Sequence, residues 1–123
     1  MVTLTEGRYA AEFIMSEAPG QQSRDNIVIA SGAGVVKPGT VLGLVTASGK
    51  YVPSPATGSD GSQTVVAICI YGVDATSADV KVAAITRGAE VNGKTLEYAA
   101  SVDDAAKKAA KATQLKAVGI IVR

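Results

Sequence analysis

The 123-residue sequence contains no histidine and no tryptophan, and Cys69 is its single cysteine. Without histidine, the chain lacks the most common general base of enzymes and the most common metal ligand. A lone cysteine forms no internal disulfide, which excludes the disulfide-stapled secreted scaffolds. Aromatic residues make up only 4% of the chain. We therefore expect a core of small side chains, mainly alanine and valine, with closely packed backbones.

The chain also lacks an excess of charge and a long apolar run. It has 12 basic and 11 acidic residues, for a net charge of +1. Nucleic-acid-binding proteins usually carry a basic excess or a basic stripe with stacking aromatics, so we expect no nucleic-acid partner. No stretch approaches the roughly 20 apolar residues of a membrane span. Residues 1–8 do not resemble a signal peptide, so we expect no membrane partner and a cytosol-like site of synthesis.

What is present favours one small β-rich domain. The length and an apolar content of 47% suit a single core. Residues 1–25 differ from the rest, since they mix charged residues with the polar run Pro19–Ser23 and show no helical periodicity. We predict a flexible N-terminal arm and loop over residues 1–25, in which only Tyr9–Met15 could form a strand, and a β-rich domain over residues 26–123.

Short apolar runs separated by turn residues predict strands from Asn26 onward. The sequence Lys37-Pro38-Gly39-Thr40 predicts a type II turn, because proline fixes φ and glycine accepts a positive φ. Asn92-Gly93 is typical of a type I′ hairpin turn. The expected strands are Ile27–Ala30, Val41–Thr46, Lys50–Val52, Thr64–Tyr71, Val80–Thr86 and Ile120–Val122.

One helix is predicted near residues 102–116, with Ser101 as its N-cap. At 3.6 residues per turn the sequence divides into an apolar face and a polar face. The apolar face consists of Val102, Ala105, Ala106, Ala109, Ala112 and Thr113. The polar face consists of Asp103, Lys107, Lys111 and Gln114. We interpret the group Lys107, Lys108, Lys111 and Lys116 as solvated, although such a group could attract an acidic surface.

The segment Gly88–Thr95 matches the phosphate-loop pattern G-x-x-x-x-G-K-[ST]. In a nucleotide-binding module Lys94 would reach the phosphates and Thr95 would hold Mg²⁺. The residues that follow leave no room for the parallel strands and second aspartate of such a module. We favour an Asn-Gly hairpin and keep nucleotide binding as the alternative.

Other candidate residues have simpler interpretations. Gly32-Ala33-Gly34 precedes no helix, so it predicts a turn. Cys69 has apolar neighbours and no histidine to activate it, which indicates a buried, inert thiol. Asp103 and Asp104 would lie in the first turn of the helix, where the helix dipole favours carboxylates. We therefore predict no catalytic residues, no cofactor, no metal site and no small-molecule substrate.

Several segments, taken in order, resemble the lambda-type bacteriophage head decoration proteins. The resemblance extends along essentially the whole chain. The segments are Thr5–Arg8, Glu12–Ala18, Ser23–Asn26, Lys37–Gly43, Thr46–Val52, Asp60–Thr64, Ile85–Arg87, Ala89–Gly93 and Gly119–Val122.

The resemblance implies a mainly β fold of the β-clip (β-tulip) type with one C-terminal α-helix. It implies a structural late protein without enzymatic activity. The protein would be made in the bacterial host cytoplasm and would bind as a homotrimer to the outside of the expanded icosahedral head. There it would contact the phage major capsid protein at three-fold sites and stabilise the virion. A β-clip ligand-binding domain of a larger assembly is a second alternative.

The arm is the predicted capsid contact. Apolar and polar residues alternate at its start, a pattern that can pair as a strand but has little to pack against alone. We expect this segment to add a strand to a capsid sheet edge. The predicted contact residues are Val2, Thr3, Leu4, Thr5, Glu6, Gly7, Arg8 and Tyr9.

Overall fold

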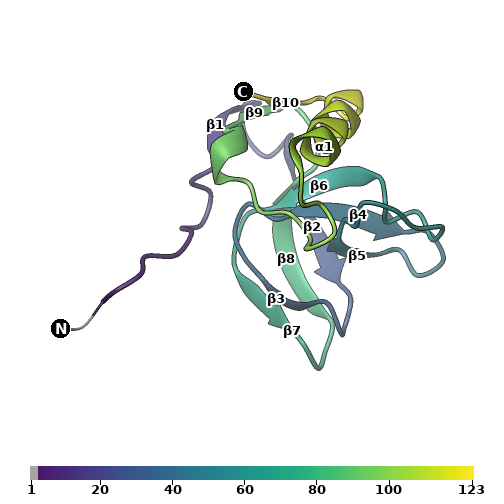
Figure 1. The fold of residues 1–123 in the computed structure, drawn as a ribbon. Helices are drawn as coiled ribbons and strands as arrows, with labels where there is room; N and C mark the ends of the chain where they lie inside the picture. Colours follow the sequence, from purple (N-terminus) through teal and green to yellow (C-terminus); the bar gives the residue numbers. More distant parts are fainter. Residues whose placement is uncertain (1–2) are drawn as a thin grey trace.

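The computed structural model describes residues 3–123 and shows a β-rich body from which the N-terminal segment extends (Figure 1). A short 3-10 helix, η1 (Gly93–Thr95), and an α-helix, α1 (Ala105–Ala117), lie in the C-terminal third. The strands are β1 (Ile14–Glu17), β2 (Arg24–Ile29), β3 (Gly34–Val36), β4 (Val41–Val45), β5 (Lys50–Pro53), β6 (Val65–Cys69), β7 (Val73–Ala75), β8 (Val80–Ile85), β9 (Ala89–Val91) and β10 (Ile120–Val122). The expected mainly β fold with one C-terminal α-helix is confirmed.

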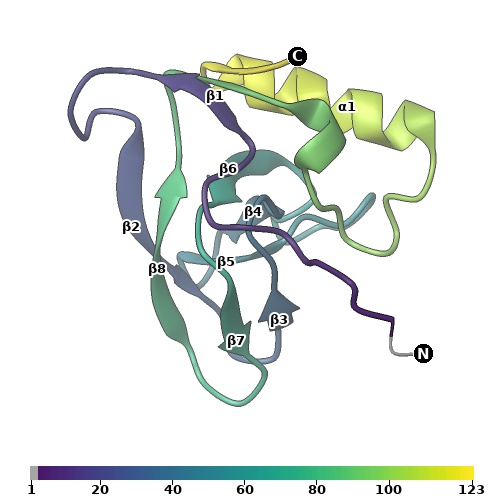
Figure 2. The same ribbon diagram turned by 90° about the vertical axis from the view of Figure 1, so that its left-hand side faces the viewer.

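Five strands close into a barrel in the order β2-β5-β4-β6-β8. Strands β2 and β8 lie side by side as an antiparallel pair, with Ile29 opposite Val80 (Figure 2). Strand β9 lies between β1 and β10 in a second sheet, and β10 packs against α1. Strands β3 and β7 form a separate antiparallel pair. At Gly43 in β4 a Cβ atom would collide with the backbone carbonyl of Ser62, so the approach of the 54–64 loop requires glycine.

Alternation along the barrel strands divides the apolar side chains into two cores. In β6, Ala67 and Cys69 belong to one core and Ile68 to the other. The first core collects side chains from β2, β4, β6 and β8, which indicates that it fills the barrel. The second joins the barrel to α1 and the three-stranded sheet through residues such as Leu115 and Ile120. Both cores are mainly aliphatic, as the low aromatic content predicts.

The free N-terminal segment is shorter than the predicted arm and loop of residues 1–25. Phe13 is fully buried in the second core, and β1 pairs antiparallel with β9. Strand β2 already begins at Arg24. Strand β1 is hard to predict from the sequence, because Ile14–Glu17 is only four residues long and shows no clear apolar run. Its pairing partner β9 lies more than 70 residues away in the chain.

One predicted turn is confirmed and one is wrong. At Lys37–Thr40 the N–H of Thr40 donates to the carbonyl of Lys37 at 3.2 Å, and Gly39 has a φ of +85°. Asn92-Gly93, predicted as a hairpin turn, instead begins η1. Asn92 has an extended backbone with a φ of −84°, and its side chain accepts the N–H of Lys94. The Asn92 side chain therefore caps η1, and no hairpin strand follows.

Helix α1 begins later than predicted and buries a different face. Asp104, not Ser101, is the N-cap, and its carboxylate accepts the N–H of Lys107 at 2.8 Å. The expected buried positions Ala105, Ala106 and Ala109 are exposed. The buried helix residues are Lys111 and Leu115. The sequence pattern placed Lys111 on the polar face, and Leu115 was not part of the predicted apolar face.

Lys111 is buried because the 54–64 loop supplies three hydrogen-bond acceptors for its ammonium group. Its Nζ donates to Ser54 Oγ at 2.9 Å and to the carbonyls of Pro55 and Gln63, each at 2.6 Å. These match the three donors of a lysine ammonium. Desolvation lowers the pKa of Lys111 below its ordinary value. The clamp formed by Lys111 and its three acceptors therefore holds α1 against the loop.

We predict that Lys111→Met destabilises the protein by about 1–3 kcal/mol, because buried carbonyls lose their donor while side-chain volume is kept. Lys116→Met, at an exposed position of the same helix, is the control and should change stability by less than about 0.5 kcal/mol. Urea unfolding measures both. Equal stability of the two variants would show that the clamp contributes nothing.

A second polar contact joins β1 to β2. The carboxylate of Glu17 accepts from Ser23 Oγ at 2.7 Å and from Arg24 Nη2 at 2.7 Å. The hydrogen bond from Arg24, followed by that from Ser23, lowers the pKa of Glu17 below its ordinary 4.5. A lowered pKa in the folded state means that stability is present above pH 4.5 and is lost as the pH falls through the folded value.

Glu17→Gln should therefore reduce the acid sensitivity of the fold. Thermal unfolding between pH 7 and pH 3 should show a smaller fall in Tm for the variant than for the unsubstituted chain. If the Tm of both proteins falls equally below pH 4.5, protonation of Glu17 does not contribute to the acid destabilisation of the fold.

Candidate functional site

Residues Thr3–Tyr9, called the arm from here on, extend away from the body (Figure 1). Every arm residue is exposed, and Leu4 is 90% exposed. The hydroxyl of Tyr9 donates to the carboxylate of Glu6, a contact within the arm itself. Val2, which was also predicted as a contact residue, lies outside the described residues. The arm therefore presents Leu4 to solvent, and within the described residues the backbone of Thr3–Arg8 makes no hydrogen bond.

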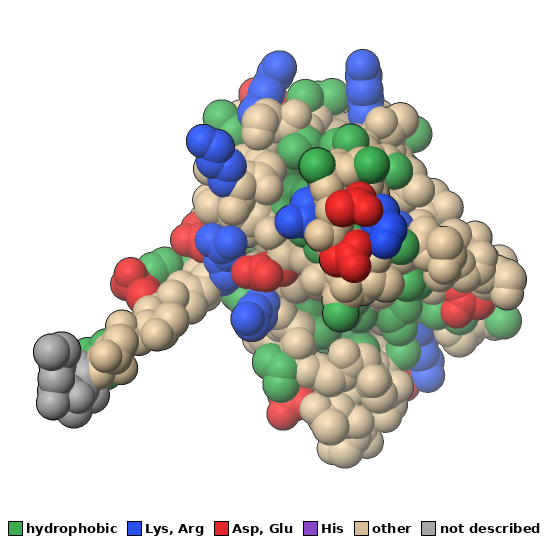
Figure 3. Space-filling model, in the orientation of Figure 1, with side chains coloured by type: hydrophobic (Ala, Val, Ile, Leu, Met, Phe, Trp, Pro, Cys, Tyr) green, Lys and Arg blue, Asp and Glu red, His purple; other side chains and the backbone are tan. Residues whose placement is uncertain are grey.

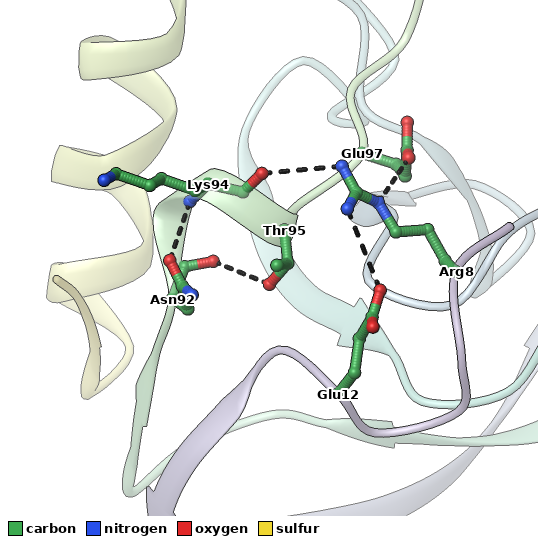
Figure 4. Close-up of polar contacts among 6 residues, drawn as sticks. All are labelled: Arg8, Glu12, Asn92, Lys94, Thr95 and Glu97. Atoms are coloured by element: carbon green, nitrogen blue, oxygen red, sulfur yellow. Dashed lines mark hydrogen bonds and ion pairs between the residues drawn. The ribbon is translucent and has the colours of Figure 1, made fainter. Parts of the chain in front are cut away.

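Arg8 fixes the arm to the body (Figure 4). Its Nε donates to Glu97 Oε1 at 2.8 Å, and its Nη2 donates to the carbonyl of Lys94 at 3.4 Å. Its Nη1 lies 3.8 Å from Glu12 Oε1. Arg8 is thus held by the body, whereas the preceding arm residues Thr3–Gly7 are free of such ion pairs among the described residues.

A tight turn follows the arm and directs the chain into the core. Ala11 has a φ of +61°, and its N–H donates to the carbonyl of Ile70 at 3.1 Å. Phe13 then enters the core, and its carbonyl accepts the N–H of Asn92 at 2.8 Å. These contacts fix the direction in which the arm leaves the body.

The segment Gly88–Thr95 does not have the geometry of a phosphate loop. It contains β9 and η1, and no α-helix begins at Lys94. A phosphate loop needs free backbone N–H groups to bind the phosphates. Here the N–H of Gly93 donates to Arg123, that of Lys94 to the Asn92 side chain, and that of Thr95 to the Asn92 carbonyl. The motif supplies a structural turn and not an anion cradle.

Two other groups with reactive potential also have structural roles. Cys69 is buried, and its Sγ donates to the carbonyl of Tyr71 at 2.9 Å. Burial raises the pKa of the Cys69 thiol to about 11, so the unreactive thiol form dominates, as predicted.

Ser54 Oγ and Lys111 Nζ lie 2.9 Å apart, like a serine–lysine dyad. Lys111, however, donates all three of its ammonium protons to hydrogen bonds, and the side chains of both residues are buried. The pair is therefore not arranged for nucleophilic catalysis.

The acidic residues of the helix start make local contacts. Asp103 accepts from Lys107 Nζ at 2.8 Å, which lowers the pKa of Asp103, and Asp104 caps α1. Within residues 3–123 no group of three or more metal-binding side chains comes together. No helix in the described part of the chain is long and apolar enough to cross a membrane.

Sequence reasoning identified the arm but missed the residues that hold it. Glu97 lies 89 positions from Arg8 in the chain, and no motif in the sequence connects the two residues. Asn92 was predicted to lie in a hairpin turn, but its side chain caps η1. Lys94 lies in η1, and its carbonyl accepts a hydrogen bond from Arg8. No periodic pattern could have linked these residues, because they lie in loops.

Comparison with known proteins agrees with this structural picture. No curated protein matches the chain in a sequence search. The family model described as bacteriophage lambda head decoration protein D matches residues 3–120, nearly the full chain. The match includes the arm, both cores and α1. The chain therefore belongs to the bacteriophage lambda head decoration protein D family.

Proposed function

We propose that this protein binds the outer surface of the expanded phage head as a homotrimer at three-fold sites and stabilises the shell. Membership of a head decoration family supports the capsid as partner and a structural role. The observation that supports a direct contact with the capsid is the arm, an exposed segment held at its base by Arg8 and bearing Leu4 at 90% exposure. A segment with this geometry gains order only when a partner covers it.

The arm is suited to add a strand to an exposed edge of a capsid sheet. Strand addition supplies main-chain hydrogen bonds for affinity, and alternate side chains set the register. Thr3 and Thr5 would face one side and Leu4 the other. Ordering the backbone costs about 1–2 kcal/mol per residue, so the contact must also bury apolar surface. Leu4 and Tyr9 are the large apolar residues that the described part of the arm exposes.

A trimer strengthens such a contact without further interactions per arm. Three arms held in one particle bind with a high effective concentration once the first has bound. If the trimer binds only the expanded shell, its binding stabilises the expanded state by mass action, because a ligand lowers the free energy only of the form that it binds. Clamping neighbouring capsid subunits in this way requires no catalysis and no cofactor.

Deletion of residues 1–7 tests the arm while keeping Arg8 and its contacts with Glu97 and Lys94. The truncated protein should fold with an unchanged Tm, because Thr3–Gly7 make no ion pair with the body. Its binding to expanded heads that lack the decoration protein should be weak or absent. Sedimentation of the heads with bound protein measures this.

A matched pair of single substitutions sharpens the test. Leu4→Ser removes the exposed apolar side chain of the arm, and Val35→Ser removes an exposed apolar side chain of β3, which is 70% exposed. We expect Leu4→Ser to weaken head binding and Val35→Ser to leave it nearly unchanged. If the truncated chain and Leu4→Ser both decorate heads as well as the full chain, the contact lies on the body.

A further inference from the structure

We infer that a lysine-rimmed hollow beside the arm receives an acidic segment of the capsid protein. This hollow, called the lysine hollow, is lined by Arg8, Lys94, Glu97, Tyr98 and Lys108, among other residues, and has a volume of about 460 Å³. The inference rests on the proposed function, since it assigns a second contact to the same partner.

The lysine hollow is continuous with the base of the arm. Arg8 and Glu97 line it and also line the neighbouring hollow between the arm and the body. Charged side chains gather where the arm joins the body (Figure 3). A capsid segment that pairs with the arm therefore continues directly past this surface.

The charges of the lysine hollow are unbalanced. The Arg8 guanidinium contacts the carboxylates of both Glu97, at 2.8 Å, and Glu12, at 3.8 Å, so these three groups together carry a net charge of −1. Lys94 and Lys108 make no ion pair with any of the described residues 3–123. Lys94 and Lys108 therefore supply two positive charges without an ion-pair partner, and together with Arg8, Glu12 and Glu97 they leave this surface with a local net charge of +1.

The geometry holds both lysines at the rim. The backbone of Lys94 is fixed on both sides, because its N–H donates to Asn92 and its carbonyl accepts from Arg8. Its side chain points away from Arg8 (Figure 4). The ammonium of Lys108 lies 5.4 Å from the centre of the Tyr98 ring, a cation–π distance. Both amines are exposed and available to a ligand.

Carboxylates on a protein segment are the ligand that this arrangement favours. The N–H groups of Gly93, Lys94 and Thr95 are already used, so the two lysines lack the backbone donors that form a phosphate cradle. Point charges at the end of flexible stems bind carboxylates without a demand for bidentate geometry. Complementary charge at the rim of an interface mainly raises the association rate and fixes register. The lysine hollow would thus guide the arm onto the shell and set its position.

Charge reversal tests the lysine hollow. In the full chain, Lys94→Glu is combined with Lys108→Glu, and the control combines Lys81→Glu with Lys116→Glu at exposed positions outside the hollow. Both double variants change the net charge equally. We expect the first to bind expanded heads about tenfold more weakly than the control, mainly through slower association. Added salt should weaken the binding of the unsubstituted chain more than that of the first variant.

A carbodiimide cross-link identifies the partner. This reagent joins a lysine amine to a carboxylate in direct contact, so decorated heads should give cross-links from Lys94 or Lys108 to capsid aspartate or glutamate. A neutral pair, Lys94→Gln with Lys108→Gln, should have an intermediate affinity and an unchanged Tm, which separates charge from folding.

The outcomes separate this inference from the proposed function. If deletion of residues 1–7 abolishes binding but charge reversal matches its control, the lysine hollow is not a contact and the arm remains one. Cross-links from Lys94 and Lys108 only to a second copy of the chain would also overturn the inference. If the unsubstituted chain does not bind heads at all, the proposed function itself fails.

Discussion

The burial of Phe13 is the constraint on which the functional architecture depends. It is the only phenylalanine of the chain and is fully buried between the barrel, β9 and α1. The tight turn at Ala11 and the pairing of β1 with β9 flank Phe13, so Thr3–Gly7 extend away from the body while Arg8 stays attached to it. A large aromatic ring in a core of small aliphatic side chains has few alternative sites, and removing such a ring typically costs about 3–5 kcal/mol.

The same anchor brings distant parts of the chain to the base of the arm. The Phe13 carbonyl binds the N–H of Asn92, and Asn92 in turn caps η1. This places the Lys94 carbonyl and the Glu97 carboxylate where Arg8 can reach both. The arm and the lysine hollow therefore adjoin each other, with the exposed arm on one side and two lysine amines without an ion-pair partner on the other. A partner that pairs with the arm would also meet these charges, and complementary charge at the rim of an interface helps to fix its register.

Sequence predicted the features that local chemistry decides. Apolar runs located the strands of the barrel and the C-terminal strand, and proline and glycine located the Lys37–Thr40 turn. It failed where a side chain finds a distant partner. Lys111 looked solvated because a lysine on a helix usually is, yet three acceptors from the 54–64 loop bury it. Asn92 looked like a hairpin residue because its side chain can serve either a turn or a cap. An exposed N-terminal segment was predictable from its charged and polar composition without helical periodicity, whereas its anchor Arg8–Glu97 depends on a fold that brings together residues 89 positions apart.

An electron cryomicroscopy reconstruction of expanded heads decorated with the full chain tests the central claim most directly. The arm mechanism predicts trimers on the three-fold axes, with Thr3–Gly7 ordered beside a capsid strand at the spacing of about 4.8 Å that a β-ladder requires. Leu4 should be covered by capsid side chains. Arms that remain unpaired in solvent, with the body contacting the shell through another face, would contradict the mechanism.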